Sequence, residues 1–265
     1  MQAPIQDIEI NYDLQGPSGA PVLTCSHCLS GDLDIWKPQV EALSEDFQVL
    51  RLDLRGHGRT SAPEGGYTMD MLAGDTLALL DHLSISRTHF LGISLGGMIG
   101  QTLALKSPER LHSLILSDTT CRVPPEMEPV WRERIAAARE KGMEALAEET
   151  LDRWLSPSFR AQDEMTTERI RRTILNTPVN GFIGCCMAIS AFDVKDRLPE
   201  VSLPAMILVG EHDPGTPVST AKEIQEQIPG AELAVLPGAY HLSNIEAAGA
   251  FNRRVRDFLH TASRA

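Results

Sequence analysis

The chain has 265 residues and a formal net charge of −12 at pH 7. This length suits one large α/β domain with an insertion or two smaller domains, and the negative charge argues against nucleic acids and anionic membranes as partners. The first residues lack the basic and apolar regions of a secretory signal, and no apolar run reaches the ~20 residues of a membrane span. Five irregularly spaced cysteines fit free thiols better than disulfides or a zinc site. We therefore expect a cytoplasmic protein.

Short apolar runs predict the strands of a sheet. They comprise residues 21–28, 48–54, 88–94, 111–118, 205–213 and 231–238. Segments with helical periodicity lie between several of them, at residues 35–43, 69–83, 98–105, 221–228 and 247–259. Residues 7–16 alternate apolar and polar side chains instead, as an antiparallel edge strand does. Apolar strands that alternate with helices indicate a mostly parallel sheet covered on both faces.

The alternation stops between residues 122 and 198. This stretch holds several helical segments, with a break at Gly142, and no clear strand. An insertion between the fourth and fifth parallel strands would lie above the carboxyl edge of the sheet, where open α/β sheets bind ligands. We therefore predict an α/β core made of residues 1–121 and 199–265, with residues 122–198 forming a helical cap.

Residues 92–96 form the pattern G-x-S-x-G at the junction of a predicted strand and a predicted helix. In that context the serine occupies a strained turn, and the flanking glycines let the strand and the helix pass closely. The hydroxyl then projects at a helix N-terminus, whose partial positive charge favours a developing anion. We interpret Ser94 as a nucleophile, the alternative being an ordinary flexible loop.

A serine nucleophile needs a base, and the base needs an acid that orients it. His241, just past the last predicted strand, is the predicted base, whereas His260 lies at the end of the final helix. Asp213 and Asp118 each end a predicted strand and compete for the role of the acid. The order Ser, Asp, His that such a strand–turn–helix nucleophile predicts favours Asp213.

Two backbone N–H groups would stabilise the oxyanion. One belongs to Leu95, directly after the nucleophile, and the other to Leu29, in the loop after the first parallel strand. Cys28 in the same loop lacks the turn of a nucleophile. His57, in the turn of residues 53–63, is interpreted as structural rather than catalytic.

From residue 21 to residue 259 the chain resembles the α/β-hydrolases, and among them the 3-oxoadipate enol-lactonases. "SGDLDIWKPQ", "LDLRGHGRTSAP" and "GISLGGMIGQTLAL" resemble many hydrolases, whereas "WRERIAAAREKGMEAL", "RWLSPSF", "GFIGCCMAI" and "HLSNIE" are more specific. The resemblance implies the α/β-hydrolase fold and a Ser94–Asp213–His241 triad. It also implies opening of an enol-lactone through an acyl-enzyme, without a metal or organic cofactor. Cys28 departs from the small residue that the family usually has after His27.

An enol-lactone of this class carries a carboxylate, so we expect a local cation to bind it. Arg134, beside Trp131 in the predicted cap, is the candidate. The alternative is a solvated arginine on a charged amphipathic helix, with Trp131 and Trp154 in the core of the cap.

Other functions stay open at this point, because one fold hosts many reactions. The same triad serves carboxylesterases, carbon–carbon bond hydrolases and perhydrolases. A receptor of this fold would bind a small molecule without turning it over. The expected partner in each case is a small molecule, and the sequence leaves the oligomeric state open.

Overall fold

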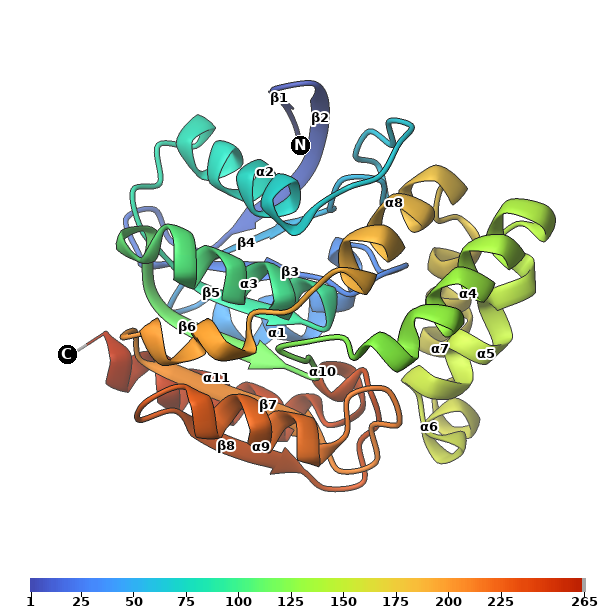
Figure 1. Cartoon of the computed structure of the whole chain (residues 1–265). Helices are drawn as coiled ribbons and strands as arrows, with labels where there is room; N and C mark the ends of the chain where they lie inside the picture. Colours follow the sequence, from blue (N-terminus) through green and yellow to red (C-terminus); the bar gives the residue numbers. More distant parts are fainter. Residues whose placement is uncertain (264–265) are drawn as a thin grey trace.

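An eight-stranded sheet forms the centre of the computed structural model, which describes residues 1–263 (Figure 1). The strand order is β1-β2-β4-β3-β5-β6-β7-β8. The strands are β1 (Gln2–Ile5), β2 (Ile8–Gln15), β3 (Val22–Ser26), β4 (Gln48–Leu52), β5 (Thr88–Ile93), β6 (Leu111–Ser117), β7 (Ala205–Gly210) and β8 (Glu232–Leu236). Strands β3 to β8 are paired in parallel, while β1 and β2 are antiparallel. The predicted mostly parallel sheet is confirmed.

The prediction of an edge strand at residues 7–16 is wrong in one respect. β2 pairs antiparallel with β4, as expected, but β1 covers its other side and is the true edge. β1 has only four residues, one of which is Pro4, so it is too short to show a pattern. Proline fits an edge strand because it cannot donate to a second neighbour.

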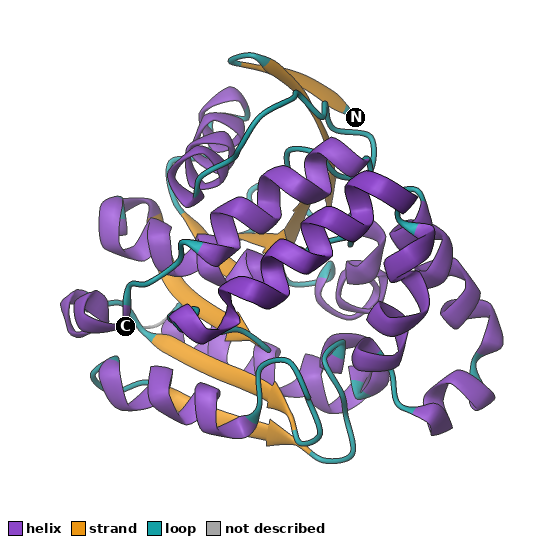
Figure 2. Ribbon diagram, turned by 45° about the vertical axis from the view of Figure 1, so that its right-hand side comes forward, coloured by secondary structure: helices purple, strands orange, loops and turns teal. Residues whose placement is uncertain are grey.

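Helices cover both faces of the sheet (Figure 2). On one face pack α2 (Met69–His82), α3 (Leu95–Lys106) and α9 (Val218–Gln227), and on the other α1 (Lys37–Leu43) and α11 (Ala248–Ala262). In α11 the buried side chains are those of Phe251, Val255, Phe258 and Leu259. This spacing places them on one side of a helix, so packing of that apolar side against the sheet fixes the helix.

A helical insertion, residues 122–198, separates β6 from β7. Its helices are α4 (Glu128–Lys141), α5 (Glu144–Trp154), α6 (Pro157–Gln162), α7 (Glu164–Leu175) and α8 (Val179–Ser190). Gly142 ends α4 with a φ of 75°, at the predicted break. An antiparallel bridge between Arg122 and Asp193 joins the two ends of the insertion. Helices α4 to α7 lie beyond the carboxyl ends of the strands (Figure 1).

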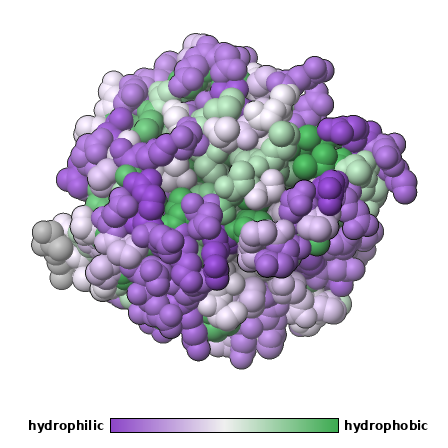
Figure 3. Space-filling model, in the orientation of Figure 1, coloured by the Kyte–Doolittle hydropathy of each residue, from purple (hydrophilic) through white to green (hydrophobic). Residues whose placement is uncertain are grey.

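The surface seen in Figure 3 is largely hydrophilic, with apolar residues gathered near the centre of this face. Exposed large apolar side chains include those of Met127 and Val130, at the start of α4 and just before it. Among residues 1–263, none of the helices combines the length and the apolarity that a membrane crossing requires.

Candidate active site

Ser94 lies between the last residue of β5 and the first residue of α3. Its φ of 55° and ψ of −115° are rare for a residue with a side chain. The Ser94 N–H donates to the carbonyl of Ser117 at 2.9 Å, and the Ser94 carbonyl accepts from the Thr119 hydroxyl at 2.7 Å. Bonds to the end of β6 and to the loop that follows it thus hold the strained turn in place.

Glycines on both sides of Ser94 permit the close crossing of β5 and α3. A Cβ atom on Gly92 would lie 2.2 Å from the carbonyl oxygen of Gly96, and one on Gly96 would lie 2.0 Å from the carbonyl oxygen of Ser26. Both distances are far below van der Waals contact, and both obstacles are backbone atoms. The close passage expected from the sequence is therefore present.

Replacing Gly96 by alanine is expected to lower the free energy of unfolding by about 2–3 kcal/mol, because the methyl group forces α3 away from β3. Gly74→Ala in α2 is the matched control. A Cβ atom there meets nothing within 4 Å, and removal of a helical glycine should stabilise by up to ~1 kcal/mol. Chemical denaturation measures both, and equal effects would contradict the crossing argument.

The predicted base and acid meet in the structure. Nδ1 of His241, in the loop after β8, lies 2.8 Å from Oδ2 of Asp213, in the loop after β7. Oδ1 of Asp213 accepts the N–H groups of Gly215 and Thr216 at 2.8 and 3.0 Å. With a proton on Nδ1 directed at Asp213, Nε2 of His241 is left as the acceptor.

Asp213 and His241 each stabilise the charged form of the other. Burial alone would raise the pKa of Asp213, but the His241 ring and the hydrogen bonds from His241 and Thr216 lower it to about 2. For His241, burial favours the neutral ring, yet the Asp213 carboxylate raises its pKa overall. Asp213 is therefore ionised near pH 7, and its charge favours the protonated form of the His241 ring.

Asp118, the other candidate for the acid, accepts hydrogen bonds from residues other than His241. Its Oδ1 accepts the Gly210 N–H at 2.7 Å, and its Oδ2 accepts the hydroxyls of Ser117 at 2.6 Å and Ser243 at 2.5 Å. Burial and the nearby Asp213 charge raise the pKa of Asp118 to about 7. Among residues 1–263, no hydrogen bond links Asp118 to His241, so the ring contacts Asp213 instead.

Ser94, Asp213 and His241 line a single pocket of about 380 Å³ below the helical insertion. In the described part of the chain, no hydrogen bond joins the Ser94 hydroxyl to His241. Such bonds are often long before substrate binds and tighten in the reacting complex. The pocket thus brings together the residues that the sequence singled out from three separate loops.

Comparison with known proteins identifies the family. The model of the alpha/beta hydrolase fold matches residues 21–248. The chain belongs to the α/β-hydrolase family. It is 34% identical to 3-oxoadipate enol-lactonase 2 of Acinetobacter baylyi, over 94% of this chain and 92% of that enzyme.

Two solved structures extend the likeness of this α/β-hydrolase. The enol-lactonase from Burkholderia xenovorans LB400 is 38% identical with a TM-score of 0.95, covering 98% of this chain and 100% of that one. A thermophilic esterase from Thermogutta terrifontis, with malate bound, is 30% identical with a TM-score of 0.93, covering 99% of both chains. The resemblance seen in the sequence, to α/β-hydrolases and especially to enol-lactonases, is confirmed.

The loop after β3 orients one predicted oxyanion donor of this α/β-hydrolase. The Cys28 carbonyl accepts from Nδ1 of His27 at 2.7 Å and from the Gly31 N–H at 3.0 Å. Because a trans peptide points its N–H opposite to its carbonyl, the Leu29 N–H faces away from these partners. Neither this N–H nor that of Leu95 donates to another residue within 1–263. Leu29 also lines the pocket.

Two buried histidines support this loop. Nε2 of His27 accepts the Leu54 N–H, and Nε2 of His57 accepts the Ser30 N–H, both at 2.9 Å. Burial lowers the pKa of His27 to about 4 and that of His57 to about 3. Both rings are therefore neutral near pH 7. The structural interpretation of His57 fits these contacts, whereas the supporting role of His27 was not predicted from the sequence.

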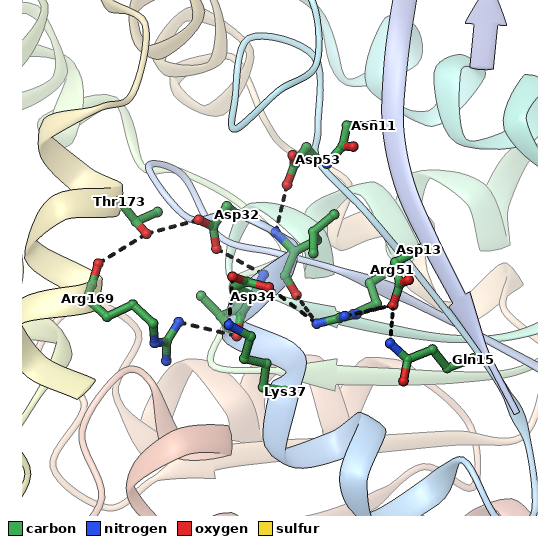
Figure 4. A network of polar contacts seen from close by, with 12 residues as sticks. Asn11, Asp13, Gln15, Asp32, Asp34, Lys37, Arg51, Asp53, Arg169 and Thr173 are labelled. Atoms are coloured by element: carbon green, nitrogen blue, oxygen red, sulfur yellow. Dashed lines mark hydrogen bonds and ion pairs between the residues drawn. The ribbon is translucent and has the colours of Figure 1, made fainter. Parts of the chain in front are cut away.

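Helix α7 reaches the far end of the same loop (Figure 4). The Thr173 hydroxyl donates to Oδ2 of Asp32 at 3.0 Å, and Nη1 of Arg169 donates to the Asp34 carbonyl at 3.3 Å. The helical insertion and the loop that carries Leu29 are thus hydrogen bonded to each other.

Arg134 of α4 lines the pocket without a partner of its own. Its guanidinium carbon lies 5.1 Å from the Trp131 ring and 5.7 Å from the Phe182 ring. Nε of Arg134 and Nε1 of Trp131 are buried and unbonded, and no described residue forms an ion pair with Arg134. Burial and the charge of Arg153 lower the pKa of Arg134 to about 10, so it remains a cation at neutral pH.

The pocket is also lined by charged residues that were not predicted from the sequence. Glu223 of α9 accepts from Arg122 at 2.9 Å and from Lys195 at 2.6 Å, so these charges offset one another. Arg153 of α5 pairs with the exposed Glu149 at 3.0 Å. Arg134 therefore differs from the other pocket arginines in lacking a carboxylate partner.

The cysteines are buried and free. Cys28 lines the pocket, but burial raises the pKa of its thiol. A protonated thiol is a poor nucleophile, so the weak alternative of Cys28 as nucleophile gains no support.

Proposed function

We propose that this α/β-hydrolase is a serine hydrolase that opens an enol-lactone, converting 3-oxoadipate enol-lactone to 3-oxoadipate. Relatives of 34% and 38% identity are enol-lactonases. The observation that carries the choice of substrate is the unpaired Arg134 in the pocket that holds Ser94 and His241. The Arg134 side chain is partly exposed, but its Nε is buried without an acceptor. A donor buried without a partner is costly, and a substrate carboxylate would accept from it and neutralise the charge.

The reaction follows from the geometry. Ser94 Oγ attacks the lactone carbonyl while Nε2 of His241 takes its proton, and Asp213 stabilises the resulting imidazolium. The N–H groups of Leu29 and Leu95 bind the oxyanion. Collapse of this intermediate breaks the ring C–O bond and expels an enolate, which takes up a proton and tautomerises to the ketone.

Water completes the cycle. His241 removes a proton from a water molecule, which attacks the acyl-enzyme and releases the Ser94 oxygen and the free acid. Each proton passes through one nitrogen, Nε2 of His241. The cycle therefore runs on these side chains and water, and it calls for no metal or organic cofactor.

The carboxylate of the lactone would bind between Arg134 and Trp131. Their buried N–H groups, Nε and Nε1, are donors without acceptors, and a carboxylate has two oxygens that only accept. We propose residues 122–198 as the cap of the α/β core, since α4 supplies both of these residues and covers the pocket.

A carboxylesterase is the second candidate function. The similarity to the Thermogutta terrifontis esterase favours it, and apolar side chains of the pocket, including Met98, Val130 and Ile189, would accept a neutral acyl group. Turnover of the enol-lactone, p-nitrophenyl acetate and a ring-cleavage diketone would separate lactonase, esterase and carbon–carbon hydrolase. Labelling by a fluorophosphonate without hydrolysis of any of these three substrates would indicate a receptor and would overturn the proposed function.

Replacing Arg134 by methionine is expected to raise KM for the enol-lactone by at least about tenfold, the scale of one lost charged hydrogen bond. KM for the neutral p-nitrophenyl acetate should stay the same. Arg132→Met is the matched control, because Arg132 is on the same helix, 70% exposed and 3.8 Å from Glu128. Steady-state kinetics of both variants tests the assignment, and equal KM values for the lactone would refute it.

A further inference from the structure

Glu246 has no part in the reaction described above, yet its carboxylate lies beside the loop of the predicted base. Glu246 ends α10 (Ser243–Glu246). Its Oε2 accepts the N–H of Tyr240 at 2.5 Å, and its Oε1 accepts the N–H of Ser156 at 2.7 Å. Tyr240 directly precedes His241, and Ser156 is the N-cap of α6 in the helical insertion. One carboxylate thus joins the histidine loop to the insertion.

A second contact lies on the other side of the histidine. The Leu242 N–H donates to the Trp154 carbonyl at 3.0 Å, and Trp154 also lines the pocket. The residues before and after His241 are therefore both hydrogen bonded to the junction of α5 and α6, directly or through Glu246. The ring of His241 projects from a segment fixed at both of its ends.

The chemistry of this bridge requires a carboxylate. Two backbone N–H donors converge on Glu246, one on each oxygen, and a carboxylate offers an acceptor at both positions. Glutamine has the same shape but a single acceptor oxygen. Its NH₂ group would face one of the two N–H donors, and that bond would be lost.

We propose that Glu246 is a positioning residue that holds the His241 imidazole in reach of Ser94 and makes its position depend on the helical insertion. The proposal rests on the proposed role of His241 as the base. A small displacement of a catalytic group is enough to slow a reaction strongly, because proton transfer needs hydrogen-bond reach.

The test is Glu246→Gln, read out as covalent labelling of Ser94 by a fluorophosphonate. We expect the maximal rate of inactivation to fall by about tenfold or more, while the inhibitor concentration for half-maximal rate and the melting temperature change little. Glu211→Gln is the matched control, since Glu211 accepts a single N–H, that of Gly238, at 2.9 Å. One amide oxygen can keep that bond, so labelling should proceed at the wild-type rate.

A second pair of variants removes the bridge from the other end. Ser156 has a φ of −61°, which suits proline, and Ser156→Pro deletes the N–H that Glu246 accepts. Ser156→Ala loses the same capping hydroxyl, which accepts the Phe159 N–H at 3.1 Å, but keeps the backbone N–H. We expect slow labelling for Ser156→Pro and nearly normal labelling for Ser156→Ala. This pair carries the test if Glu246→Gln does not fold.

The outcomes separate the two proposals. Wild-type labelling that does not depend on Ser94 overturns the proposed function itself. Ser94-dependent labelling that is equally fast in folded Glu246→Gln overturns the positioning role alone. Slow labelling of Glu246→Gln together with equal rates for both Ser156 variants overturns the dependence on the insertion.

Discussion

Ser94→Ala is expected to lower kcat for the enol-lactone by about 10⁴-fold or more and to abolish labelling by a fluorophosphonate. The reason is that the pocket offers no substitute nucleophile. The Cys28 thiol is held in its protonated form by burial, and water would have to attack without the covalent step. Steady-state kinetics and mass spectrometry of the labelled protein measure the two effects.

The control for this variant should also be a serine with a positive φ. Ser84 is exposed and has a φ of 56°, close to the 55° of Ser94. Ser84→Ala therefore removes a hydroxyl from another residue with a positive φ, and it should leave both kcat and labelling unchanged. Equal labelling of wild type and Ser94→Ala would end the nucleophile assignment, provided that the melting temperatures show both proteins to be folded.

The parallel sheet could be predicted because its central strands have no solvent-exposed side and are therefore rich in apolar residues. Every residue of β5 and β7 is buried, so β7 and the part of β5 after His89 appear as continuous apolar runs. The strand ends were less well predicted. His27, Cys28 and Asp213 are buried in loops, and burial continues after the ladder of backbone hydrogen bonds has stopped.

The serine turn could be predicted because all its requirements are local. A side chain on Gly92 or Gly96 would clash with backbone atoms within a few residues or in the adjacent strand. The G-x-S-x-G pattern therefore shows this requirement directly. Arg134 is different. Whether it faces the pocket depends on the rotation of α4, which is fixed by packing against α8 and α5. No spacing within the α4 sequence reports these contacts.

The supporting bonds of the site could not be predicted at all. Glu246 and Ser156 are far apart in the sequence, as are Thr173 and Asp32, and each pair meets only because the insertion folds back over the sheet. A glutamate or threonine on a helix surface carries no sign of such a partner. Long-range polar contacts of this kind are properties of the assembled fold.

The choice between the two carboxylates is also long-range, and it leads to the second large effect. Asp213→Asn is expected to lower kcat by about 10³- to 10⁴-fold. The Asn oxygen can still accept the N–H groups of Gly215 and Thr216, which now bind Oδ1. Its NH₂ group then faces Nδ1 of His241 and donates to it. The ring proton moves to Nε2, where it blocks acceptance of the Ser94 proton.

Asp118→Asn is the matched comparison, because both residues follow neighbouring parallel strands and both are buried. Asp118 accepts bonds from Gly210, Ser117 and Ser243, and an amide with one acceptor oxygen cannot keep them all. This variant should therefore lose stability but retain most of its kcat, measured well below its melting temperature. The reverse result, an active Asp213→Asn and an inactive Asp118→Asn, would transfer the role of the acid to Asp118. In that case the His241 ring would have to leave Asp213 and turn toward Asp118, at the end of β6, during the reaction.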